Sequence, residues 1–125
     1  MTTSTLINLS DKAVRALKKI APYKRYSSHS PLHYQGQTPI VAYYIIKGSI
    51  LLQKKNKTYH KMTTGSLIGY RELLLNIPSL FTAQAQKNTE LCYIDKSTFY
   101  EIMNSTNAEM QRLYNELSKI IGHVE

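Results

Sequence analysis

Residues 65–85, GSLIGYRELLLNIPSLFTAQA, are the stretch that decides how the rest of the chain is interpreted. Gly65 and Gly69 open it, an apolar helical turn follows at residues 73–75, and Pro78 ends that turn before residues 82–85 resume the alternation of a strand. A strand, a tight turn, a short helix and a second strand in so short a stretch can direct backbone N–H groups at an anion. The sequence therefore predicts a candidate anion site here.

The composition is that of a folded domain. The chain has 125 residues, 42% hydrophobic and 19% charged, and we expect one domain over residues 1–125. No apolar run approaches the ~20 residues of a membrane span, and the first ten residues lack the features of a secretory signal. We therefore expect a cytoplasmic protein with no membrane partner. The single cysteine, Cys92, lies in an apolar segment and is expected to be a small buried residue.

The net charge of +8 is unevenly distributed. Residues 1–62 hold eleven basic residues and one acidic residue, whereas residues 63–125 hold five basic and seven acidic residues. A basic face of this kind can meet phosphate, an anionic ligand or an acidic partner protein. Four lysines surround a predicted hairpin, where lysines commonly keep a sheet edge solvated, and we favour that interpretation for Lys54, Lys55, Lys57 and Lys61.

The periodicity predicts one helix followed by many short strands. Ser10 is a plausible N-cap for a helix over residues 10–21, which Pro22 must end. Short segments rich in tyrosine and β-branched residues follow, separated by glycine, proline and asparagine. Eight such segments without long intervening helices favour an antiparallel barrel or jelly roll over residues 24–94. The predicted strands are 24–27, 31–34, 41–47, 49–54, 58–62, 67–68, 82–86 and 89–94.

The last part of the chain returns to helical periodicity. Helices are predicted over residues 96–103 and 107–121, the second after a capping cluster at residues 105–107. The second helix has an apolar stripe that can pack on the sheet or against a second copy of the chain, and the pattern leaves both open. The stripe and its flank consist of Met110, Leu113, Tyr114, Leu117, Ile120 and Ile121.

Side chains with catalytic or metal-binding chemistry form no recognisable set. His29 and His33 lie in a region of strands and turns, and no third ligand lies at a standard distance from them. The sequence has no His-x-His motif, no Gly-x-Ser-x-Gly turn and no P-loop. We therefore expect no enzyme, no metal and no cofactor. Most of the ten tyrosines lie among aliphatic residues in predicted strands, so we expect them in the core rather than on a nucleic-acid platform.

Three motifs carry a family resemblance. Residues 33–37, HYQGQ, look like a turn of aromatic, acid, glycine and acid; residues 43–48, YYIIKG, look like a strand end; and residues 65–69, GSLIG, match a glycine pair. Together with the order of the elements, they resemble the cyclic-nucleotide-binding domain of the cyclic-AMP-receptor and fumarate–nitrate-regulator (CRP/FNR) superfamily. The resemblance covers nearly the whole chain. It implies an eight-stranded antiparallel double-stranded β-helix, or jelly roll, with one N-terminal helix and two C-terminal helices.

The resemblance also implies where a ligand would bind. In members that bind cyclic nucleotides, a glutamate after the second glycine holds the ribose hydroxyl, and an arginine before a small-residue pair holds the cyclic phosphate. Tyr70 and Phe81 occupy these places here, and phenylalanine makes no charge-assisted contact with a phosphate. We therefore expect a degenerate cassette that does not bind cyclic AMP or cyclic GMP by the usual contacts. The implied pocket residues are Gly69, Tyr70, Arg71, Glu72, Leu73, Phe81, Thr82 and Ala83.

The function implied by the resemblance is regulatory. We expect a sensor or effector domain of a CRP/FNR-type transcription regulator, a homodimer through its last helix, with an unidentified small-molecule effector. The family's helix-turn-helix does not occur in residues 1–125, so DNA would be contacted only through a domain outside this sequence. Two alternatives remain open. One is a free-standing protein-interaction module that uses the basic face of the roll, and the other is non-specific nucleic-acid binding.

Overall fold

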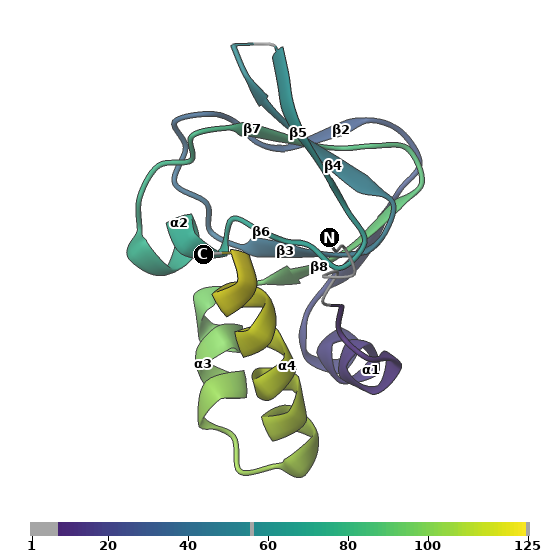
Figure 1. Ribbon diagram of the computed structural model, residues 1–125, viewed down its shortest axis with the longest axis vertical. Coiled ribbons are helices and arrows are strands. Elements are labelled where there is room, and N and C mark those ends of the chain that lie inside the picture. Colours follow the sequence, from purple (N-terminus) through teal and green to yellow (C-terminus); the bar gives the residue numbers. More distant parts are fainter. Residues whose placement is uncertain (1–7, 56, 125) are drawn as a thin grey trace.

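Two four-stranded antiparallel sheets form the centre of the molecule (Figure 1). The computed structural model describes residues 8–55 and 57–124. The first sheet has the order β1 (Tyr23–Tyr26), β8 (Thr89–Ile94), β3 (Ala42–Lys47) and β6 (Leu67–Ile68). The second has the order β2 (Ser30–His33), β7 (Thr82–Ala85), β4 (Ser49–Lys54) and β5 (Lys57–Thr63). Most strands that follow one another in the chain lie in different sheets, and β4 and β5 are the exception. The predicted jelly roll is confirmed.

Four helices accompany the strands in the described residues: α1 (Asp11–Ile20), α2 (Tyr70–Leu75), α3 (Lys96–Asn104) and α4 (Ala108–Val124). Side-chain oxygens cap three of them, as helix starts require. Ser10 Oγ accepts from the N–H of Ala13 at 3.2 Å, which confirms the predicted cap of α1. Asp95 caps α3, and Asn107 caps α4 by accepting from the N–H of Glu109 at 2.8 Å. The last helix extends three residues beyond its predicted end.

The apolar side chains form two cores, one on each face of the first sheet. Successive residues of a strand point to opposite faces. Tyr43 and Ile45 therefore point between the two sheets, whereas Tyr44 and Cys92 point to the outer face, which α1, α3 and α4 cover (Figure 1). Cys92 is fully buried, as predicted, and burial raises the pKa of its thiol to about 11. The cores thus account for the paired tyrosines of β3.

The apolar stripe of α4 lies in the core between the helices and the outer face of the first sheet. Leu113, Leu117 and Ile120 are at most 3% exposed, because α4 packs on α1 and α3 and over the outer face of the first sheet. Of the two arrangements that the sequence left open for the stripe, these three residues are in the first, packed within the chain itself. Tyr114 is exposed, and Met110 and Ile121 are half-buried.

The β4–β5 hairpin projects from the roll (Figure 1). β5 is the edge strand of its sheet, and Lys55, Lys57 and Lys61 are exposed along it, while Lys54 is half-buried. Their placement agrees with lysines that keep a sheet edge in solvent. Residue 56, the middle of the predicted turn, lies outside the described residues. None of the helices in the described ranges is both long and apolar enough to cross a bilayer.

Candidate functional site

The stretch quoted first folds as β6, a turn, α2, a loop and β7. Gly69 enters α2 with φ +82°, and Asn76 leaves it with φ +56°. The N–H groups of Asn76 and Ile77 both donate to the carbonyl of Glu72, which closes the end of this short helix. α2 begins at Tyr70, three residues before the apolar turn predicted from the sequence. Tyr70 and Leu73 therefore share one face of the helix, and both are buried.

The loop between α2 and β7 is fastened to the turn at residues 34–37. The N–H of Gly36 donates to the carbonyl of Ser79, and the N–H of Ser79 donates to the carbonyl of Gln37, each at 2.8 Å. The N–H of Gln35 donates to Thr82 Oγ1 at 2.9 Å. The motif at residues 33–37 is thus held to the segment from Ser79 to Thr82 by two backbone hydrogen bonds and one to a side chain.

Tyr70 points away from the interior of the roll. Its ring lies in the core shared with the helices, and its hydroxyl donates to the carbonyl of Ile121 in α4 at 3.4 Å. The residue that follows the second glycine therefore connects α2 to the last helix.

Phe81 is half-buried and meets aromatic rings of β5. Its ring centroid lies 6.0 Å from that of Tyr59 and 5.7 Å from that of His60. Arg71 is exposed on α2. Ala83 is buried between the sheets, Thr82 is half-buried and Leu73 belongs to the other core. The predicted pocket residues thus divide between two cores and the surface.

His33 and Ser79 form a polar contact at the cassette that sequence reasoning missed. His33 Nε2 lies 3.0 Å from Ser79 Oγ, whose hydroxyl donates to the carbonyl of Phe81 at 2.8 Å. When the serine hydroxyl donates to Phe81, Nε2 carries the proton of the imidazole and donates to the serine oxygen. Nδ1 is then an acceptor, and it is buried without a hydrogen-bond partner among the described residues. Burial lowers the pKa of His33, and the charge of Glu72 partly opposes that effect.

Aromatic side chains fill the roll beside this contact. The ring of Tyr43 meets Tyr93 edge-on, with centroids 5.4 Å apart, and its hydroxyl donates to the carbonyl of Leu32 at 3.3 Å. Burial raises the pKa of Tyr43 to about 12, so the phenol stays neutral. Tyr43 is a core residue, as expected, and Tyr93 is half-buried. The expectation does not extend to most of the ten tyrosines, because five of them are exposed: Tyr23, Tyr34, Tyr59, Tyr100 and Tyr114.

A hollow of about 620 Å³ opens on the side of the roll between β1, β2 and β3. Tyr26, Tyr43 and Tyr93 contribute aromatic surface to it, and Lys24 and Arg25 contribute positive charge. The volume falls within the range of small-molecule sites, roughly 300–1,000 Å³. Metal binding has no comparable support, because the described residues contain no group of three or more His, Cys, Asp or Glu side chains that could hold an ion.

Comparison with known proteins identifies the family. The sequence profile of the cyclic nucleotide-binding domain matches residues 23–106, more than half of the chain. The chain therefore belongs to the cyclic nucleotide-binding domain family. Comparison with curated protein sequences gives no match.

Solved structures share the fold. The catabolite activator protein of Thermus thermophilus superposes with a TM-score of 0.70 at 18% identity, over 93% of this chain and 55% of that one. A cyclic nucleotide-binding-like protein of Brucella abortus gives 0.65 at 25% identity, over 77% and 86%. The N-terminal domain of a transcriptional regulator of Streptomyces coelicolor gives 0.67 at 15% identity, over 94% and 87%. The chain spans about half the length of the Thermus protein.

Proposed function

We propose that this chain is the regulatory domain of a CRP/FNR-type transcription regulator whose cassette does not hold cyclic AMP or cyclic GMP by the family's usual contacts. The observation that carries the proposal is the position of Phe81, which packs against Tyr59 and His60 where nucleotide-binding members place an arginine. The domain is regulatory rather than catalytic and acts in the cytoplasm. DNA is contacted through a domain outside these residues.

The energetics support a cassette without a cyclic phosphate. An anion buried between two sheets needs a positive partner, and the loss of a charge-assisted bidentate contact costs several kcal/mol of binding. Phe81 supplies none, and Tyr70 is engaged with the carbonyl of Ile121. Rings of His33 and Tyr43 occupy part of the roll interior next to the loop.

An effector of another kind remains compatible with the fold. The hollow between β1, β2 and β3 combines tyrosine rings with Lys24 and Arg25 at its rim, which suits a small molecule with an apolar body and an anionic group. Its binding would be transmitted through the roll to α2, and from there through Tyr70 to α4. The change would appear as a shift in the angle between α3 and α4.

A homodimer through α4 is part of the proposal, with a smaller set of contacts than the sequence predicted. Tyr114 and Met103 are exposed and lie beside an apolar hollow of about 300 Å³ formed by α2, α3 and α4. A second copy of the chain would cover these side chains together with Met110 and Ile121. Leu113, Leu117 and Ile120 would support the helix from within the protomer.

Isothermal titration of the protein with cyclic AMP and with cyclic GMP tests the degenerate cassette. We expect no saturable heat with either nucleotide at millimolar concentration. A Phe81→Ala variant is the matched control, because it removes the ring without adding a charge, and it should behave as the wild type does. A saturable isotherm with the wild-type protein that Phe81→Ala weakens would contradict the proposal directly.

A further inference from the structure

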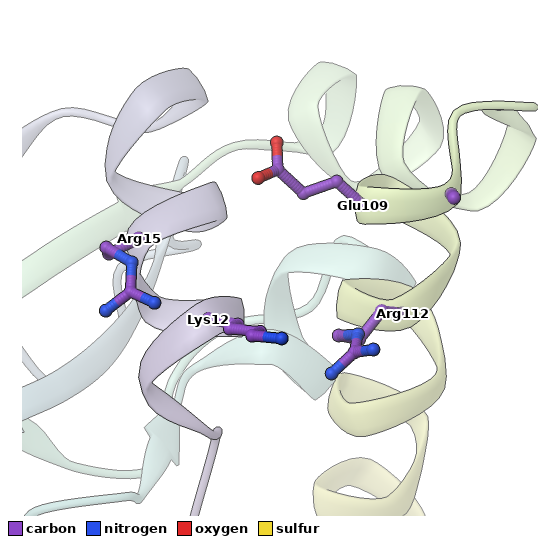
Figure 2. A pocket seen from close by; sticks show the side chains of 5 residues that line it. Lys12, Arg15, Glu109 and Arg112 are labelled. Atoms are coloured by element: carbon purple, nitrogen blue, oxygen red, sulfur yellow. The ribbon is translucent and has the colours of Figure 1, made fainter.

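A basic hollow of about 390 Å³ lies between α1 and α4, on the helical side of the molecule and away from the cassette. It is lined by Lys12, Arg15, Ala108, Glu109 and Arg112. Figure 2 shows Lys12 and Arg112 reaching toward each other from the two helices, with Glu109 extending from the start of α4 toward α1. This hollow is not part of the site described above.

The charged residues of both helices repeat at the spacing of one helical face. Lys12, Arg15 and Lys19 are three and four residues apart on α1, and Glu109, Arg112 and Glu116 have the same spacing on α4. Two contacts join these faces at opposite ends. Glu116 is joined to the start of α1, and Glu109 is joined to the last turn of α1.

These contacts use the negative charge of α4. The Nζ of Lys19 lies 3.3 Å from Oε2 of Glu109. Glu116 accepts from the N–H of Ser10 at 2.7 Å and from its hydroxyl at 2.9 Å. By contrast, no ion pair or hydrogen bond joins the side chains of Lys12, Arg15 or Arg112 to any other described residue. Within the described residues, Lys12, Arg15 and Arg112 therefore line one hollow without an ion pair of their own, and the carboxylate of Glu109, which also lines it, is paired with Lys19.

The size of the hollow limits what can occupy it. On α4 the hollow is lined from Ala108 to Arg112, and these residues span only about 6 Å of helix. That length suits a compact anion better than a helix or an extended strand of a partner protein. The planar guanidinium groups of Arg15 and Arg112 can each form paired hydrogen bonds with phosphate oxygens, and Lys12 adds a point charge.

We propose that the hollow between α1 and α4 binds two or three linked phosphate groups of a small soluble molecule. Lys12 and Arg15 hold the phosphates from α1, and Arg112 holds them from α4. Because the ligand bridges both helices, its binding stabilises their packing and raises the unfolding temperature in proportion to ligand concentration. The site gives this domain a ligand independent of the cassette.

Isothermal titration with pyrophosphate and with tripolyphosphate tests the site. The variant Lys12→Gln/Arg15→Gln/Arg112→Gln removes the three charges. The variant Lys54→Gln/Lys57→Gln/Lys61→Gln removes equal charge from the hairpin. We expect saturable binding by the wild type and the hairpin variant, at least about tenfold weaker binding by the first variant, and weakening with added salt. Circular dichroism checks that each variant is folded, and the single exposed change Arg112→Gln should already weaken binding.

Three results would overturn the proposal. One is the absence of saturable binding of either polyphosphate to the wild type at low salt. Another is an equal loss of affinity in the two triple variants, which would mean general attraction to a basic chain. The third is preference for another anion through the same three side chains. Hexaglutamate binding more tightly than tripolyphosphate would indicate an acidic protein segment, and binding to vesicles containing phosphatidic acid without polyphosphate binding would indicate a lipid headgroup.

Discussion

The imidazole of His33 stacks on the phenol ring of Tyr43, with centroids 5.8 Å apart and 19° between the ring planes. The same imidazole is joined through Nε2 to Ser79 in the loop before β7. One buried, titratable ring thus connects the interior of the roll with the cassette loop.

Stability should fall as His33 becomes protonated. Burial lowers the pKa of His33 below its ordinary value of 6.5. The unfolded chain therefore binds more protons than the folded chain in this range, and the free energy of unfolding rises with pH. The contribution is complete above pH 6.5 and is lost as the pH falls through 6.5 toward the lower folded pKa. Urea unfolding at pH 5.5 and pH 7.5 should show the wild type less stable at the lower pH.

The variant His33→Phe keeps a ring against Tyr43 and removes the titration. It should lose part of the stability difference between the two pH values, while His29→Gln, a change at an exposed histidine, should keep that difference. The pH dependence of stability that remains in His33→Phe comes from other titratable groups. An undiminished difference in His33→Phe would show that His33 is not its source.

Local patterns were sufficient to predict most of the fold. Alternating tyrosine and aliphatic residues, with glycines and prolines between them, placed the eight strands within one residue of where they lie. Most of these strands turn one face toward a core, whereas β5 is exposed except at the half-buried Met62. The stripe of α4 was equally clear as a pattern. The pattern did not show which element covers this stripe, because a period of three and four residues identifies an apolar face and does not identify its partner. In the structure the chain's own α1 and α3 cover Leu113 and Leu117.

The sites depended on contacts that no local pattern contains. His33 and Ser79 are 46 residues apart in the sequence. Arg15 and Arg112 come from opposite ends of the chain, and only the packing of α1 on α4 brings them to one hollow. The sequence shows that Tyr70 and Phe81 replace the family's usual residues at the cassette. It does not show that the Tyr70 side chain points toward Ile121. Spacing along the chain therefore predicted the region of a site but not which side chains come into contact there.

Two glycines with nearly equal backbone angles should differ in their tolerance of alanine. Gly36 has φ +91° and Gly48 has φ +94°. A Cβ at Gly36 meets no atom within 4 Å, so Gly36→Ala should cost only the left-handed strain, about 1–2 kcal/mol. A Cβ at Gly48 would lie 2.7 Å from Cα of Thr89, and overpacking should add about 1–3 kcal/mol. Urea unfolding of both variants measures the difference. Equal losses would mean that β8 moves aside freely.

The cap of α4 should contribute measurably to stability. Asn107 Oδ1 accepts from the N–H groups of Glu109 and Met110 at 2.8 and 3.3 Å. Asn107→Ala leaves both donors without this partner and should lower the free energy of unfolding by about 1 kcal/mol. Asn107→Asp keeps the acceptor and is the matched control, with stability near that of the wild type. If both variants lost the same amount, the capping bonds would not be the cause.

Leu117 and Tyr114 lie on the same helix and should respond to truncation in different ways. Leu117 is 2% exposed, so Leu117→Ala leaves a cavity and should lower the free energy of unfolding by about 2–5 kcal/mol. Tyr114 is 41% exposed, so Tyr114→Glu should keep the fold. Under the proposed homodimer, it should also shift the mass measured by light scattering from two chains to one, because a charge would lie in the interface. A wild-type protein that is already monomeric at high concentration, or a dimer unchanged by Tyr114→Glu, would remove this face of α4 from the proposal.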